Sequence, residues 1–219
     1  MIFTLLMTFN ANALDLFKAN YSVFKEGKKI GRSIIHLTKD DPFYTITDKT
    51  DGTHGMASFL GFKRSEKTLF TSNNGMLSPE SYKMSQKVAF NKRSSSYQID
   101  KENNEVNGNY KGDDWQLKTQ QAFLTPNLVS LKLFLDVCAG KKDNLNYRVL
   151  KKGSLHDYQF KITSENKNII EVDKVHSKAS RVTKLWLDTN QHCLPIRTYH
   201  IEEGEDSLET KLLSFEIQI

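Results

Sequence analysis

The chain has little of what usually marks an enzyme or a multidomain protein. Its 219 residues include two cysteines and four prolines, and no Pro-rich or Ser/Gly-rich stretch divides them. The sequence contains no Gly-x-Ser-x-Gly elbow, no phosphate-binding loop and no Gly-x-Gly-x-x-Gly motif. Its six histidines lack the spacing of a zinc site, such as His-x-x-x-His. We therefore expect no metal, no cofactor and no catalytic residues.

The N-terminus has the character of a secretory leader. An uncharged apolar stretch, Met1 to Phe9, runs into Ala11-Asn12-Ala13, the small-x-small pattern that signal peptidases cut. These 13 residues are too few for a membrane-spanning helix, which takes about 20. The leader lacks its usual positive charge, which leaves open a start further upstream. We predict an exported, periplasmic protein with a signal peptide at residues 1–13, one domain at 14–219 and no transmembrane span in the mature chain.

Positive charge is in excess, but its placement does not indicate a nucleic-acid surface. Lys and Arg number 31 against 26 Asp and Glu, a formal net charge of +5. The aromatic residues follow the alternating period of a core instead of clustering with arginines. We interpret the basic pairs as solvated faces and protection of edge strands, with at most a weak attraction to anionic lipid headgroups. The pairs are Lys63-Arg64, Lys92-Arg93, Lys141-Lys142 and Lys151-Lys152.

Alternation of apolar and polar residues runs through most of the chain. Phe17 and Tyr21 share one face of a strand with Ala19, because successive side chains of a strand point to opposite sides. The pattern predicts a mainly β fold made of antiparallel strands. The same period, interrupted by turns, recurs over residues 30–37, 43–47, 67–71, 81–86, 88–99, 145–149, 158–162, 182–187, 194–201 and 213–219.

One segment has the period of a helix. Thr125-Pro126 supplies an N-cap and a first-turn proline, and Gly140-Lys141-Lys142 supplies the stop. An apolar stripe at helical spacing lies between them. We predict a single-domain curved antiparallel sheet, or partly open barrel, with one helix at about 125–139 packed against it. The stripe consists of Leu128, Leu131, Phe134, Leu135 and Cys138.

The two cysteines leave two interpretations open. Cys138 lies on the helical stripe and Cys193 precedes a strand, so they form either a disulfide or two separate buried thiols. A thiol enzyme is not indicated by the neighbouring His192, because adjacent residues of an extended segment point to opposite faces.

The stretch from Gly52 to Phe62, here called the lip, differs from the other turns. It places Met56, Phe59, Leu60 and Phe62 between glycines, where an antiparallel connection is normally polar. Two interpretations remain open. The lip is either a flap that belongs to the core, or a mobile segment that gates an apolar cavity or touches a membrane or another protein.

Several short motifs occur in an order and spacing that resemble the bacterial domain-of-unknown-function family 3108, over nearly all of the mature chain. The resemblance implies export from a Gram-negative cell, and it assigns no activity and no catalytic residue. Its expected fold is similar to that of periplasmic lipoprotein carriers, in which a curved sheet with a helical plug shelters acyl chains. The motifs are Phe17–Tyr21, Gly27, Ile30-Gly31, Gly55–Gly61 with Glu66, Leu77–Pro79, Tyr158–Phe160, Trp186-Leu187 and Leu194–Arg197.

These observations favour a periplasmic, non-enzymatic protein that binds an apolar or lipid-like ligand, or an envelope component, with contributions from the lip and Arg197. The alternative is an assembly scaffold that docks another envelope protein. An enzyme is the third hypothesis, and it requires His54, Glu66 and Arg197 to converge on one cleft. Trp186 is expected in the core, and Arg197 is expected to pair with a carboxylate, face solvent or contact a ligand headgroup.

Overall fold

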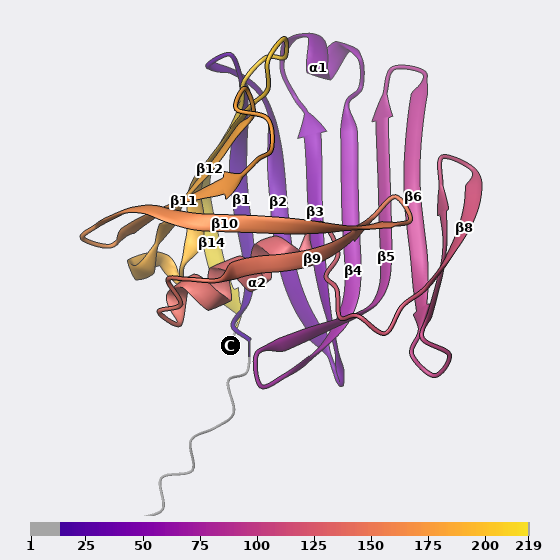
Figure 1. Cartoon of the computed structure of the whole chain (residues 1–219). Coiled ribbons are helices and arrows are strands. Elements are labelled where there is room, and N and C mark those ends of the chain that lie inside the picture. Colours follow the sequence, from indigo (N-terminus) through magenta and orange to yellow (C-terminus); the bar gives the residue numbers. More distant parts are fainter. Residues whose placement is uncertain (1–13, 219) are drawn as a thin grey trace, which may run out of the picture.

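A computed structural model describes residues 14–218, and in this range all the strands belong to one antiparallel sheet (Figure 1). The predicted signal peptide lies outside the described residues. The strands are β1 (Leu16–Lys25), β2 (Lys28–Asp40), β3 (Phe43–Gly52), β4 (Lys63–Asn73), β5 (Met76–Val88), β6 (Asn91–Asp100), β7 (Glu105–Tyr110), β8 (Asp113–Lys118), β9 (Leu145–Lys151), β10 (Ser154–Asn166), β11 (Ile169–Val175), β12 (Val182–Asp188), β13 (Leu194–Ile201) and β14 (Leu208–Gln218). The helices are α1 (Gly55–Phe59), α2 (Leu128–Cys138) and the short 3-10 helix η1 (Thr189–Gln191).

The order of the strands brings the beginning and the end of the described chain together. From β8 to β1 the strands follow one another in reverse sequence order, and β14 then pairs with β1 and leads back through β13 to β9. Leu16 is the register partner of Gln218, and Lys25 is that of Leu208. The sheet curls so that β9 and β10 pass across the concave side of β1 to β5 (Figure 1).

The helix α2 fills one half of the concave side. Leu128 and Leu133 are 0% exposed, and they belong to one apolar cluster with residues of both walls, such as Phe70 of β4 and Val149 of β9. The hydroxyl oxygen of Thr125 accepts a hydrogen bond from the amide of Leu128 at 3.2 Å, as an N-capping residue does. The prediction of a mainly β, single-domain curved sheet with one packed helix is therefore confirmed.

The apolar stripe predicted for α2 is narrower than the buried surface that the helix has in the structure. Val129, Leu133 and Val137 are buried in addition to most of the stripe, because strands face the helix from more than one side. Cys138, predicted to be interior, lies instead on an exposed turn of the helix end.

The two end strands of the sheet, β8 and β9, do not pair with each other anywhere in residues 14–218. The segment after β8 closes part of the gap, because Leu124 forms an isolated bridge to Val149. Its amide donates to the carbonyl of Arg148 at 2.8 Å, and its carbonyl accepts from Leu150 at 3.0 Å. The β9–β10 turn also meets β8, where Gly153 packs on the ring of Trp115. The result is a barrel-like shell without a complete ladder.

Three strands and one turn were missed from the sequence. β7 and β8 are short, polar and Gly-containing or acidic, and β11 has one buried residue, Val172, so the alternation of all three is weak. The predicted strand at 88–99 instead covers the last residue of β5 and all of β6 except Asp100, and a tight turn at Ala89-Phe90 separates the two strands. Ala89 has a positive φ of 52°, and a turn made of Ala and Phe lacks the Gly, Asn or Asp residues that usually indicate such a conformation.

Candidate functional site

The lip rises from the end of β3 and returns into β4, with α1 as its central turn (Figure 1). α1 has no buried residue, and the side chains of Met56 and Phe59 are 66% and 81% exposed. Leu60 and Phe62 are half-buried at the base of the lip. In the structure the lip is therefore not a flap that belongs to the core.

Arg197 lies on the outer surface of the sheet, away from the lip. Its guanidinium stacks over the ring of Trp186 at 4.4 Å from the centroid, and its Nε pairs with the carboxylate of Glu209. Trp186 is half-buried, and its indole N–H donates to Glu171 at 3.1 Å. The expectation that Trp186 is a core residue is wrong, because its neighbours Leu185 and Leu187 occupy the inner face and leave it the outer one.

The three residues required for an enzyme site do not converge. His54 is exposed on the lip, Glu66 is buried on the inner face of β4, and Arg197 is on the outer face of β13. Among the described residues, no group of three or more His, Cys, Asp or Glu side chains is placed to hold a metal ion. None of the helices in residues 14–218 is long and apolar enough to cross a membrane.

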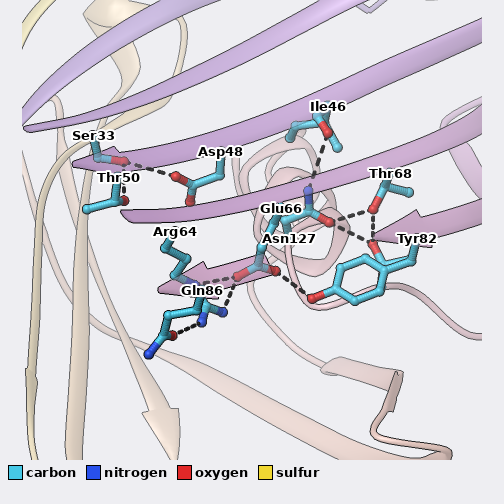
Figure 2. A network of polar contacts seen from close by, with 11 residues as sticks. Ser33, Ile46, Asp48, Thr50, Arg64, Glu66, Thr68, Tyr82, Gln86 and Asn127 are labelled. Carbon is cyan, nitrogen blue, oxygen red and sulfur yellow. Dashed lines mark hydrogen bonds and ion pairs between the residues drawn. The ribbon is translucent and has the colours of Figure 1, made fainter. Parts of the chain in front are cut away.

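A network of polar side chains lines the inner face of β3, β4 and β5 next to the lip (Figure 2). Glu66 is 7% exposed, and one of its carboxylate oxygens accepts from the Nε of Arg64 at 3.0 Å. Its other oxygen accepts from the hydroxyl of Tyr82 at 2.9 Å, and Arg64 also donates to Gln86 at 2.8 Å. Burial, and then the charge of Glu66, raise the pKa of Tyr82. Both oxygens of Glu66 are thus engaged within the protein, as a buried charge requires.

Asp48 is the direct register partner of Glu66 on the same inner face. Its carboxylate accepts from Ser33 at 2.9 Å, and Ser33 in turn accepts from Thr50 at 3.0 Å (Figure 2). Burial, and then the nearby charge of Glu66, raise the pKa of Asp48 to about 6, although Ser33 and Arg64 oppose this shift. This carboxyl group therefore titrates well above the usual range of an aspartate.

A second part of the network ties the segment before α2 to the sheet. Asn127 accepts hydrogen bonds from Thr68 at 2.6 Å and from Thr125 at 2.9 Å, and its amide donates to the carbonyl of Ile46 at 3.4 Å (Figure 2). Thr68 and Thr125 are 0% exposed. Because these buried groups satisfy one another, the network explains how the entry into α2 is fixed against β3 and β4.

The opposite end of the shell holds a pocket of about 650 Å³ beside α2. Leu131, Phe134 and Leu135 form its helical wall, and most of the side chains that face them are apolar. The polar groups at the pocket include Lys132, which pairs with Asp136. Asp136 also accepts from the hydroxyl of Tyr147 at 2.8 Å. The remaining lining residues are Leu14, Asp15, Phe17, Leu37, Asn74, Gly75, Cys138, Ala139, His192, Cys193, Leu194 and Ile217.

A disulfide between Cys138 and Cys193 borders this pocket. Their Cα atoms are 6.1 Å apart, a distance that a disulfide can span. Of the two interpretations left open by the sequence, the structure therefore shows the disulfide and not two separate thiols. It closes a separation of 55 residues, which on the chain-entropy model stabilises the fold by about 4 kcal/mol. The bridge joins the end of α2 to the turn before β13.

Comparison with known proteins supplies the family. The family model described as "Protein of unknown function (DUF3108)" matches residues 17–199. The chain belongs to the DUF3108 family. No curated protein matches this DUF3108 chain at a significant level. The family resemblance read from the short motifs is therefore confirmed.

The fold of the DUF3108 chain has a solved counterpart. A crystal structure of a beta-barrel-like protein of the domain of unknown function DUF1849, from Brucella abortus, is similar with a TM-score of 0.55. The alignment covers 94% of this chain and 99% of that one at 10% sequence identity. At this identity the similarity concerns the fold, and it supports the barrel-like description given above.

Sequence reasoning missed both the pocket and the inner polar network. The pocket is assembled from the start of β1, the β4–β5 turn, α2 and the turn before β13, which are far apart in the sequence. The stripe that ends at Cys138, together with a second cysteine, is the one signal that pointed to this place. Asp48, Arg64 and Glu66 fall on core positions of the alternating period, which could have marked them as buried charges.

Proposed function

We propose that this DUF3108 protein is a periplasmic, non-enzymatic binding protein that holds the apolar part of an amphiphile in the pocket beside α2. The observation that carries this proposal is the pocket itself. Its volume of about 650 Å³ lies within the range of roughly 300–1,000 Å³ common for small-molecule sites, and α2 contributes the apolar side chains of Leu131, Phe134 and Leu135 to its wall.

The distribution of polarity supports an amphiphile over a purely apolar ligand. Polar side chains border the pocket in the ion pair Lys132–Asp136 and in the contact of His192 with Asp15, with 3.4 Å between Nδ1 and Oδ2. Such a site buries an acyl or other apolar chain against the helix and leaves a polar headgroup near these polar side chains.

The proposed compartment agrees with the cysteine chemistry. Disulfides persist in oxidising compartments such as the periplasm, and the Cys138–Cys193 bridge borders the pocket. The exported location also rests on the apolar leader of the sequence.

The lip has no part in this pocket. It lies where β4 begins, whereas the pocket reaches Asn74 and Gly75 just beyond the last residue of β4. β4 spans 11 residues, so the two features lie at opposite ends of the shell.

A pocket-filling substitution tests the proposal. Ala139 lines the pocket and is exposed, so Ala139→Trp places an indole in it at little expected cost to the fold. Ala179→Trp is the matched control, because Ala179 is an exposed residue of the turn between β11 and β12. The probe is a dansyl-labelled fatty acid titrated by fluorescence, together with native mass spectrometry of protein purified from the periplasm.

We expect the unmodified protein and the Ala179→Trp variant to bind the probe alike, and Ala139→Trp to bind at least about tenfold more weakly. Equal binding by both variants, or a purified protein that carries no amphiphile and does not take up the probe, would overturn the proposal. Crosslinking in cells that traps one dominant protein partner and no lipid would favour the assembly scaffold instead.

A further inference from the structure

Three large apolar side chains are exposed together at the lip end of the shell. Met56 and Phe59 of α1 are 66% and 81% exposed, and Phe90 of the β5–β6 turn is 101% exposed. The two segments touch, because the amide of Ala89 donates to the carbonyl of Leu60 at 2.6 Å. We call Met56, Phe59 and Phe90 the apolar tip.

The backbone of the lip is held in place by hydrogen bonds, so the exposure of the apolar tip is a built feature. Gly52 donates to the carbonyl of Phe62 at 2.8 Å, and Phe62 donates to that of Ala57 at 2.9 Å. The turn packs so closely on β3 that a Cβ at Gly52 would lie 2.5 Å from the carbonyl oxygen of Ala57. Glycine at this position is therefore what allows the lip to fold back on the strand.

A row of lysines lies next to the apolar tip on the outer face of the sheet. Lys63 of β4, Lys87 of β5 and Lys92 of β6 are direct register partners, and all three are exposed. Like charges placed directly opposite one another destabilise a sheet. None of the three forms an ion pair with any residue of the range 14–218, in contrast to Lys25 and Lys184. We call these three residues the lysine row.

More lysines extend the lysine row along the same face. Lys49, Lys67 and Lys83 are exposed on β3, β4 and β5, and Lys67 is the register partner of Lys83. A shallow groove of about 530 Å³ runs here, lined by serines as well as lysines, with Asp51 as its acidic residue. Protection of sheet edges does not explain this charge, because β4, β5 and β6 are inner strands of the sheet.

We propose that the apolar tip and the lysine row dock this end of the protein onto an anionic phospholipid bilayer. The aromatic and Met side chains enter the interfacial region, and the lysines lie at the level of the phosphates. The composition favours lipid over a protein partner, because lysine is depleted in protein interfaces, whereas aromatic residues flanked by lysines are typical of membrane surfaces. This proposal does not depend on the pocket beside α2.

Vesicle flotation tests the charge part of the proposal. The full chain is mixed with vesicles of phosphatidylethanolamine and phosphatidylglycerol, or of phosphatidylcholine alone, at low and high salt. We expect binding to the anionic vesicles that falls with salt. Substitution of Lys63, Lys87 and Lys92 by Gln is expected to weaken binding to the anionic vesicles by about 100-fold, because each lysine contributes about fivefold. The charge-matched control replaces Lys118, Lys161 and Lys167 by Gln, which are exposed on β8, on β10 and in the β10–β11 turn.

A local probe tests the insertion of the apolar tip. Cys138 and Cys193 are paired with each other, so a new cysteine at Phe59→Cys is a unique site for an NBD fluorophore. We expect its emission to shift to the blue on anionic vesicles. The same label at Phe43→Cys, at the opposite end of the shell, is expected not to shift. Phe59→Ser with Phe90→Ser lowers the partition coefficient at least about tenfold, whereas Phe43→Ser with Met76→Ser changes it less than about twofold.

The proposal is overturned by equal binding to neutral and anionic vesicles, by an unchanged emission at residue 59, or by equal losses in the tip and control variants. Retention by a protein partner in place of vesicles would also overturn it. All substituted side chains are exposed, so the variants are expected to fold, which a thermal melt of each verifies.

Discussion

The same strands line an apolar interior at the α2 end of the shell and a polar interior at the lip end. On β4, Phe70 points into the apolar core around α2, and Glu66 and Arg64, on the same face, point into a polar network near the lip. On the outer surface, the apolar tip is exposed at the end where the interior is polar. The comparison teaches that the alternating period determines which face is inside, whereas the helix that fills the interior determines which end of that face is apolar.

The comparison also separates two kinds of apolar residue. The apolar residues packed around α2 are buried by segments distant in the sequence, whereas those of the apolar tip have no such neighbour among residues 14–218. Substitutions at the two ends should therefore differ in their effect on stability, and each prediction below tests one part of this difference.

The largest effect is expected at the α2 end. Leu133 is 0% exposed, so Leu133→Ala leaves a cavity and lowers the free energy of unfolding by about 3 kcal/mol. Phe59→Ala at the lip removes a larger but exposed side chain and should change it by less than about 0.5 kcal/mol. Urea denaturation of both variants measures the difference. Similar losses would show that the lip belongs to the cooperative core.

An intermediate, pH-dependent effect is expected in the polar network. The folded pKa of Asp48, about 6, lies above its value in an unfolded chain, about 3.9. Between these two pH values the native state thus binds more protons than the unfolded chain does. The contribution of Asp48 to stability is therefore most favourable below about pH 4 and is lost as the pH rises through 6. Asp48→Asn should raise the free energy of unfolding by about 1–2 kcal/mol at pH 7.5 and by little at pH 4.5.

The matched control for this titration is Asp51→Asn, on the same strand but pointing to the opposite face. Its effect on the free energy of unfolding should be small at both pH values. A carboxyl titration of Asp48 by NMR that gave a midpoint near 4 would contradict the assignment of a buried carboxyl group next to Glu66.

The smallest effect is expected on the outer surface at Trp186. Because the ring is half-buried under the guanidinium of Arg197, Trp186→Ala should lower the free energy of unfolding by about 1 kcal/mol. A fully buried tryptophan would cost about 3 to 5 kcal/mol. Thermal and urea denaturation distinguish these values. A loss of free energy of unfolding in the higher range would show that Trp186 is a core residue.

Much of the fold was accessible from local patterns. The strands with strong alternation, such as those around Phe17 and Tyr147, were placed because one face of each is buried and the other is more exposed to solvent. α2 was placed by Thr125-Pro126 and by Gly140, whose backbone preferences act within a few residues. β7 and β8 escaped prediction because they contribute few buried side chains.

The candidate site was accessible only in part. The lip was recognised because apolar residues between glycines are unusual in a connection, but its neighbour Phe90 was taken into a strand. Lys63 and Lys92 were interpreted as parts of solvated faces or edge protection, although pairing of β4, β5 and β6 puts them in one row with Lys87. Register between strands is set by the whole sheet, and so this clustering could not be read from either segment by itself.

The sequence by itself determined the fold class, the single helix and the family, because short-range periodicity and turn residues act locally and their order is preserved along the chain. Only the tertiary structure decided the pairing of Cys138 with Cys193, the pocket beside α2, the polar network around Glu66 and the lysine row. Each of these depends on which distant segments become neighbours. That choice comes from the packing of α2 and the sheet around one core, which no local pattern records.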